Sequence, residues 1–165
     1  SPIRANSEDS YRLGLEVDVT IAVAKSFYIK PNFTLSSNKN VDLTVDGFSY
    51  GNTDIAYSPD LIIGNIFVYK PIANLYVSLL QKFVGKQYMN NIELPEAKLD
   101  AYFVNDFNIA YEIFPKSVFK SIMVNVLVNN IFDTEYVANG YMWDVYPYYY
   151  PQAGINFLAG LTLKF

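Results

Sequence analysis

The side chains that could do chemistry in this sequence are few. It contains no histidine and no cysteine, so the commonest general base, the commonest metal ligand and any thiol nucleophile are missing. Asp106 and Glu112 share one face of a predicted strand, but they lie six residues apart. That separation is roughly 20 Å in an extended chain, too far for a catalytic carboxylate pair. We therefore predict no catalytic site, no cofactor and no metal centre, and we expect a protein that is not an enzyme.

Acidic and glycine residues gather in one connecting segment, where Asp42, Asp46 and Asp54 accompany Gly47 and Gly51. Carboxylate oxygens of this kind can bind calcium. The spacing does not match the EF-hand pattern, however. A plain exposed loop is the favoured interpretation.

The segment Tyr141–Tyr150 is rich in aromatic residues. Tyrosine and tryptophan provide rigid contact area at low entropic cost, which suits a binding surface, and stacked rings could hold a sugar, a porphyrin or a catecholate. The alternatives are an aromatic belt at a membrane interface or a loop packed on its neighbours. The candidate ligand-contact residues are Tyr141, Trp143, Tyr146, Tyr148 and Tyr149.

The elements that must position these residues are β-strands, because apolar and polar residues alternate with period two. The clearest alternation places Leu13, Leu15, Val17, Val19 and Ile21 opposite Arg12, Gly14, Glu16, Asp18 and Thr20. Such a strand fits lipid on one side and a wet lumen on the other. The seven predicted strands are Tyr11–Ala22, Phe27–Ser36, Leu61–Tyr69, Leu75–Val84, Tyr102–Phe114, Ser121–Phe132 and Ile155–Phe165.

The connections between these strands alternate between short and long. The short ones are 23–26, 70–74 and 115–120, and the long ones are 37–60, 85–101 and 133–154. In an antiparallel meander every second connection lies at the same end, so short turns gather at one rim, as in outer-membrane barrels. The fold class we predict is all-β, an up-and-down transmembrane β-barrel segment. Seven strands leave two open edges, so we expect a part of a larger barrel.

The composition favours a membrane environment. Hydrophobic residues make up 52% and charged residues 17% of the chain, against roughly 25% charged residues in soluble domains. No apolar run approaches the roughly 20 residues of a membrane-spanning helix, so a spanning chain would have to be a closed barrel. A soluble β-sandwich remains the alternative. The net charge is −4 without a basic stripe, so nucleic acid is not an expected partner.

Several segments resemble the C-terminal strands of TonB-dependent outer-membrane receptors, most closely those of Bacteroidetes. The stretch VLVNNIFDTEY at 126–136 resembles a motif in the penultimate strand of that family, with Ile131 in place of its usual leucine. The ending YYYPQAGINFLAGLTLKF at 148–165 resembles the closing strand, although Gln152 stands near the place of a usual arginine. The residues that match the first motif are Asn130, Phe132, Asp133 and Tyr136.

This resemblance implies a bacterial outer-membrane location, a barrel of 22 strands, and an N-terminal plug through which TonB drives uptake. Residues 1–165 would be the C-terminal barrel segment, without the plug and the earlier strands. The segment Ser1–Asn6 has no features of an export signal. The implied partners are outer-membrane lipid and a small-molecule or glycan substrate, such as a ferric siderophore, haem or cobalamin. A non-transporting structural or adhesive barrel and a soluble β-sandwich binding module are the alternatives.

The C-terminus carries an alternating apolar stripe, made of Phe157, Leu161, Leu163 and Phe165. It resembles the signal that the barrel-assembly machinery recognises. Recognition would proceed by strand addition, in which backbone hydrogen bonds provide affinity and alternate side chains fill pockets. Any lipid-facing closing strand would carry the same stripe, so the pattern alone leaves both explanations open.

Overall fold

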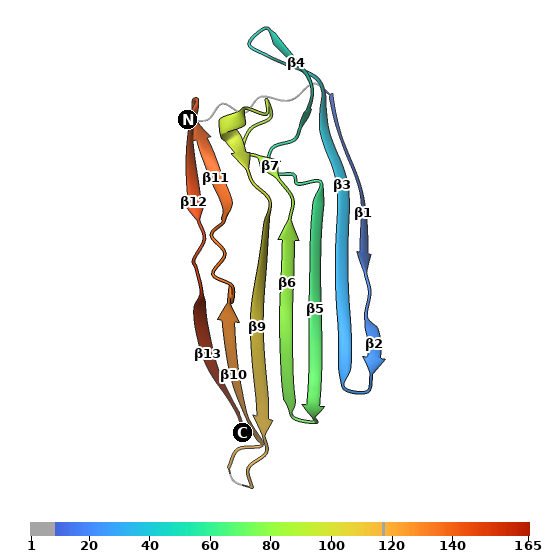
Figure 1. Ribbon diagram of the computed structural model, residues 1–165, viewed down its shortest axis with the longest axis vertical. Coiled ribbons are helices and arrows are strands. Elements are labelled where there is room, and N and C mark those ends of the chain that lie inside the picture. The colour runs from blue at the N-terminus through green and yellow to red at the C-terminus, as the bar shows by residue number, and fades with distance from the viewer. Residues whose placement is uncertain (1–8, 117) are drawn as a thin grey trace.

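The computed structural model describes residues 9–116 and 118–165, and nearly all of the regular structure is strand (Figure 1). The segment Ser1–Asn6 lies outside the described residues. No helix in the described part of the chain is long and apolar enough to cross a membrane. The elements are β1 (Asp9–Asp18), β2 (Ile21–Ala24), β3 (Phe27–Val45), β4 (Phe48–Asp54), β5 (Leu61–Ile72), β6 (Leu75–Val84), β7 (Gln87–Tyr88), the 3-10 turn η1 (Pro95–Ala97), β8 (Lys98–Leu99), β9 (Tyr102–Ile113), β10 (Ser121–Asn129), β11 (Val137–Trp143), β12 (Tyr146–Pro151) and β13 (Asn156–Lys164).

The main sheet follows the order β1-β3-β5-β6-β9-β10-β13, and every neighbouring pair is antiparallel. The seven-stranded meander that the sequence predicts is therefore confirmed. Its strands form one curved layer with short turns at one end and long connections at the other (Figure 1). The soluble β-sandwich is wrong, because no second large sheet packs on this one in the described residues.

Apart from Asp9 and Lys39 at the long-connection end, the register separates apolar from charged side chains. Residues directly opposite each other share a face of a sheet, and Leu15 lies opposite Leu35, which lies opposite Leu61. Farther along, Leu79 lies opposite both Phe67 and Phe107. We call the side on which these residues lie the apolar face. The charged residues of the other face are Arg12, Glu16, Asp18, Lys30, Lys82, Asp106, Glu112 and Lys164.

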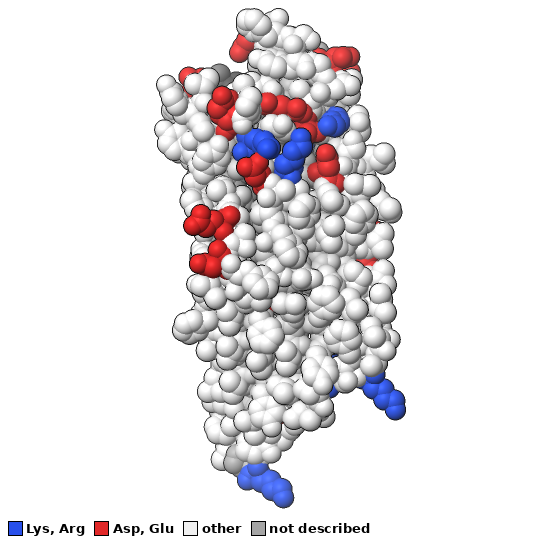
Figure 2. Space-filling model, viewed as in Figure 1, with Lys and Arg blue, Asp and Glu red and all other residues white. Residues whose placement is uncertain are grey.

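The apolar face is open rather than buried, since Leu13, Ile109 and Phe157 are all exposed. A small cluster of buried residues, Met89, Ala97 and Leu99, lies instead among the long connections. Figure 2 shows charged side chains gathered toward the long-connection end and lysines at the other end, with a largely uncharged zone between. A sheet with its apolar side outward and its charges at both ends fits a surrounding bilayer.

One row of polar side chains crosses the apolar face. Asn65, Gln81 and Asn105 lie opposite one another on β5, β6 and β9, and we call them the amide row. Gln81 Nε2 donates to Asn105 Oδ1 at 2.9 Å, and Asn65 Nδ2 lies 3.5 Å from Gln81 Oε1. Asn105 is only 2% exposed, and Asn65 Oδ1 is buried without a hydrogen-bond partner among the described residues. Gln81, which interrupts its strand's apolar pattern in the sequence, is thus the centre of a network.

The predicted long loops contain more strand than the sequence indicates. β3 continues to Val45 and pairs with β4, so the segment 37–60 is mostly a hairpin. Its turn contains Asp46 (φ 52°) and Gly47 (φ 81°), as two-residue hairpin turns with positive φ prefer. The predicted first strand is divided into β1 and β2, and Val19 N, at the division, donates to Pro31 O at 3.1 Å.

Candidate functional site

The aromatic segment forms a hairpin of β11 and β12 above the end of the main sheet (Figure 1). Its register places Tyr141 opposite Tyr148 and Trp143 opposite Tyr146. Side chains alternate between the two faces of a strand, so these rings lie on one face together with Tyr150. We call this set the aromatic platform: Tyr141, Trp143, Tyr146, Tyr148 and Tyr150.

The rings at the base of the aromatic platform pack on one another. The Tyr141 ring stacks on that of Tyr148 with 5.0 Å between centroids and 10° between planes, and the Tyr150 ring lies 5.9 Å away. Trp143 and Tyr146 flank the turn and are 67% and 64% exposed. The base is therefore held in place, whereas the tip presents two large rings to a ligand.

The opposite face of this hairpin is fixed to the long connection between β6 and β9. Met142 packs against the buried cluster of Met89, Ala97 and Leu99. A Cβ at Gly140 would lie 2.5 Å from Tyr148 O and 2.6 Å from Met89 Sδ, so only glycine permits this close approach. The aromatic platform thus has a rigid support.

Two tyrosines contribute hydroxyl groups to this support. Tyr149 Oη donates to Glu96 O at 2.8 Å, and Tyr57 Oη donates to Gly140 O at 2.9 Å. Burial of Tyr57 raises its pKa. Four of the five predicted contact residues share the platform face, whereas Tyr149 lies on the other face. Tyr150 belongs to the platform but was not predicted, because a run of three tyrosines does not show which face each one occupies.

The predicted acidic loop is part of the β3–β4 hairpin. Asp54 pairs with Lys39, and the hydrogen bond to Asp54 is the main reason that the pKa of Lys39 is raised. Among the described residues, no group of three or more acidic side chains is placed to hold a metal ion. Asp54 therefore contributes a cross-strand ion pair to the hairpin.

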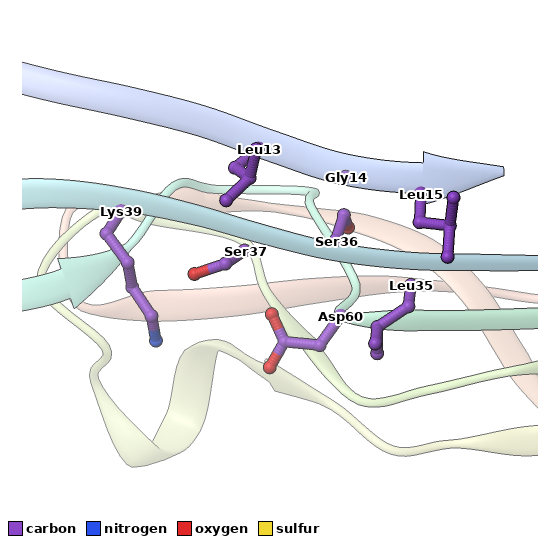
Figure 3. Close-up of a pocket in the computed structure, with 8 residues that line it drawn as sticks. All are labelled: Leu13, Gly14, Leu15, Leu35, Ser36, Ser37, Lys39 and Asp60. Carbon is purple, nitrogen blue, oxygen red and sulfur yellow. The ribbon is translucent and has the colours of Figure 1, made fainter.

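An open groove of about 570 Å³ lies along the edge strand β1 and its neighbour β3 (Figure 3). Leu13, Leu15 and Leu35 of the apolar face contribute its apolar wall, and Lys39 and Asp60 also line it. Such a wall at an open sheet edge suits contact with lipid or with another strand. We do not assign a ligand to it.

The residues that carry the family resemblance form a clasp between β10 and β13. Asn130 and Asp133 both have positive φ, 50° and 52°. Asn130 Nδ2 donates to Thr134 O at 2.9 Å and to Ala153 O at 3.3 Å. Asp133 Oδ1 accepts from Ile155 N at 2.7 Å. We call Asn130 and Asp133 with these bonds the clasp.

The other residues of that motif have different surroundings. The Tyr136 ring packs on Tyr102 at 4.5 Å, whereas Phe132 is exposed. Asp106 Oδ1 accepts from Asn130 N at 2.8 Å, so this carboxylate is a support of the clasp as well as a charge on the polar face. The motif therefore positions the hairpin that carries the aromatic platform.

Replacing Asp133 by alanine should destabilise the start of β13 by about 1–3 kcal/mol, because Ile155 N loses its acceptor. Gly154→Ala should have a similar effect, since its Cβ would lie 2.4 Å from Asp133 Oδ1. Asp133→Asn keeps an oxygen acceptor and should cost less. Limited proteolysis of residues 130–155, with urea unfolding in detergent, measures the effect. Equal resistance of all three variants and the parent would show that the clasp has no stabilising role.

The C-terminal stripe lies on β13, the edge strand. Leu161 and Leu163 lie opposite Val124 and Ile122 of β10, while Phe157 and Phe165 are exposed. The Phe165 ring packs on Phe119 at 5.0 Å. All four predicted residues thus occur on or just beyond one accessible strand edge, as both a lipid-facing role and an assembly signal require.

Comparison with known proteins gives similarity in structure only. No protein-family model and no curated protein sequence matches this chain. The siderophore receptor PiuA from Acinetobacter baumannii matches 92% of this chain with 21% of its own length, at a TM-score of 0.71 and 15% identity. The ferric yersiniabactin uptake receptor FyuA from Yersinia pestis matches 91% of this chain with 22% of its own length, at a TM-score of 0.68 and 18% identity.

The ferric-catecholate import receptor Fiu from E. coli, in its closed form, matches 88% of this chain with 20% of its own length, at a TM-score of 0.64 and 20% identity. The chain therefore spans about a fifth of the length of the receptors it matches. These similarities show the fold, which is a β-barrel segment like that in the matched receptors. The receptors they involve are transport proteins rather than enzymes.

Proposed function

We propose that this chain is the C-terminal barrel segment of a TonB-dependent outer-membrane receptor, and that the receptor imports a ferric siderophore. The observation that carries the proposal is the exposed apolar face, because a sheet with its apolar side outward needs lipid around it. The similar solved structures support a receptor of iron-carrying ligands. In this proposal an upstream plug fills the barrel, couples to TonB and completes the ligand site with the external loops.

The aromatic platform is the part of the described chain that we expect to contact the ligand. Its supporting face is anchored, its rings are preorganised, and it lies at the end of the long connections. Aromatic rings of this kind suit the planar rings of a catecholate or phenolate siderophore. A haem or glycan ligand could contact the same rings. Binding measurements with each ligand class therefore distinguish between them.

Replacing both Trp143 and Tyr146 by alanine should weaken ferric-siderophore binding by about 1–3 kcal/mol, or roughly 5- to 150-fold. The exposed rings are lost, while the packed base of the platform stays. The measurement is calorimetric titration of the purified receptor that contains this segment, with ferric catecholates first and then hydroxamates, haem and glycans.

Phe48→Ala is the matched control, because Phe48 is an exposed ring at the tip of the β3–β4 hairpin. Unchanged affinity in Trp143→Ala/Tyr146→Ala would remove the platform from the ligand site. If no ferric siderophore binds the parent receptor, the siderophore assignment itself fails. An upstream gene region that encodes no plug would instead favour a structural or adhesive barrel.

A further inference from the structure

The three short turns of the sheet share a pattern. Each carries lysine within two residues of an exposed aliphatic side chain, and Val118 reaches 80% exposure. We call these turns, with the adjoining strand ends, the short-turn rim. The combinations are Val23 with Lys25, Ile72 with Lys70, and Val118 with Lys116 and Lys120.

The short-turn rim is positively charged. Among its described residues Glu112 is the single acidic residue, and its Oε1 lies 3.3 Å from Lys164 Nζ. Lys70 Nζ lies 4.8 Å from the centre of the Tyr76 ring. Lys25, Lys116 and Lys120 are exposed and form no ion pair within the described part of the chain.

The opposite rim has the reverse balance, with acidic residues outnumbering basic ones. Figure 2 shows acidic side chains gathered at the long-connection end and, among charged side chains, only basic ones at the far end of this view. The acidic residues of the long connections and adjoining strand ends are Asp42, Asp46, Asp54, Asp60, Glu93, Glu96, Asp100, Asp133, Glu135 and Asp144. Charge is thus distributed asymmetrically between the two rims, which in a membrane-spanning barrel lie at opposite membrane surfaces.

We propose that the short-turn rim binds the headgroups of anionic phospholipids in the leaflet that it faces. Each turn combines the two contacts that such a lipid offers, since an aliphatic side chain can enter the acyl boundary while a lysine reaches a phosphate. Exposed rings of Phe114 and Phe165 at the same rim suit the headgroup level. A soluble acidic protein would leave the exposed aliphatic side chains without an apolar partner. The inference rests on the membrane-spanning barrel of the proposed function and is independent of its ligand.

The test uses the purified receptor that contains this segment, titrated with short-chain phosphatidylglycerol and, separately, phosphatidylethanolamine. Bound lipid is counted by native mass spectrometry. Each lysine near an anionic surface contributes about fivefold in affinity. Lys116→Gln/Lys120→Gln should therefore weaken phosphatidylglycerol binding by about 25-fold, and Lys116→Arg/Lys120→Arg should retain it. The preference for phosphatidylglycerol should fall with added salt, which shortens the Debye length from about 10 Å at 0.1 M to about 3 Å at 1 M.

The control is Lys86→Gln/Lys98→Gln, which removes the same number of charges at the opposite rim. An equal loss in this control would assign the effect to net charge and overturn the proposal. So would equal affinity for the two lipids, or displacement of the lipid by free glycerol phosphate at matched concentration. Ferric-siderophore binding, measured on the same samples, should not change. A receptor that binds no siderophore but keeps the lysine-dependent lipid preference would contradict the proposed ligand and leave this inference standing.

Discussion

Replacing Gln81 alone by leucine should destabilise the barrel more than replacing the whole amide row by apolar residues. Gln81→Leu leaves Asn105 Oδ1, on the apolar face and buried, without the donor that now lies 2.9 Å away. A buried polar group left unpaired costs about 1–3 kcal/mol. In Asn65→Val/Gln81→Leu/Asn105→Leu no amide remains to be satisfied, and such replacements can be neutral or stabilising.

Urea unfolding of the receptor in lipid vesicles gives the free energies of unfolding for this comparison. Asn65→Val alone should have the smallest effect, because its contact with Gln81 is 3.5 Å long and its Oδ1 is already unpartnered. A triple variant that loses the sum of the three single losses would contradict the idea that the amides act as one network.

The amide row also explains how neighbouring strands find their register. A shift of the pairing by two residues keeps every side chain on its own face. An apolar pattern alone therefore does little to exclude such a shift. The slipped sheet would place Gln81 opposite hydrocarbon side chains. Cysteine pairs at Ile63 and Phe83, which lie opposite each other, should therefore cross-link less completely in the triple variant than in the parent.

Replacing Phe165 by alanine should sharply reduce the amount of receptor in the outer membrane, while the purified barrel still refolds in detergent. The ring is 69% exposed and packs on Phe119, so its loss should cost no more than a few kcal/mol of a large barrel's stability. A recognition signal read by strand addition, in contrast, depends on each pocket being filled. Protease accessibility on intact cells measures insertion, and heat-dependent gel mobility measures refolding.

Phe103→Ala provides the comparison, because Phe103 is an exposed ring of the apolar face near the opposite rim. If Phe165→Ala reaches normal surface levels, the stripe is only a packing feature. If both variants insert poorly and both refold poorly, the cause is stability rather than recognition.

Most strands of the main sheet could be predicted because they have one apolar and one polar side, whereas β5 is apolar on both sides over most of its length. The contrast between the two sides is lost where a strand continues beyond the apolar face. Residues 37–41 of β3 are mostly polar on both faces, so the alternation disappears although the strand continues to Val45. The Asp46–Gly47 pair was a usable signal for the hairpin that follows. Pairing partners beyond the bilayer are fixed by turns and single hydrogen bonds, which leave little trace in composition.

The candidate site, like the fold, could be predicted only in part from the sequence. Residue type identified the aromatic segment, but only the pairing of β11 with β12 shows which rings share a face. The clasp depends on a hydrogen bond between Asp133 and Ile155, 22 residues away, and on two residues with positive φ. A short sequence motif specifies neither of these features. The plug, the TonB partner, the Bacteroidetes origin and the assembly signal stay predictions.

The scarcity of buried hydrophobic residues has a consequence for the order of events in biogenesis. The buried hydrophobic residues in the described part of the chain are only Leu43, Val84, Met89, Ala97, Leu99 and Val104. They provide far too little apolar area to offset the conformational entropy of the chain in water. The free energy that orders the main sheet is then mostly a partition free energy between water and hydrocarbon. If the sheet spans a membrane as we propose, folding and insertion become a single step, and the apolar face is exposed to water until that step occurs.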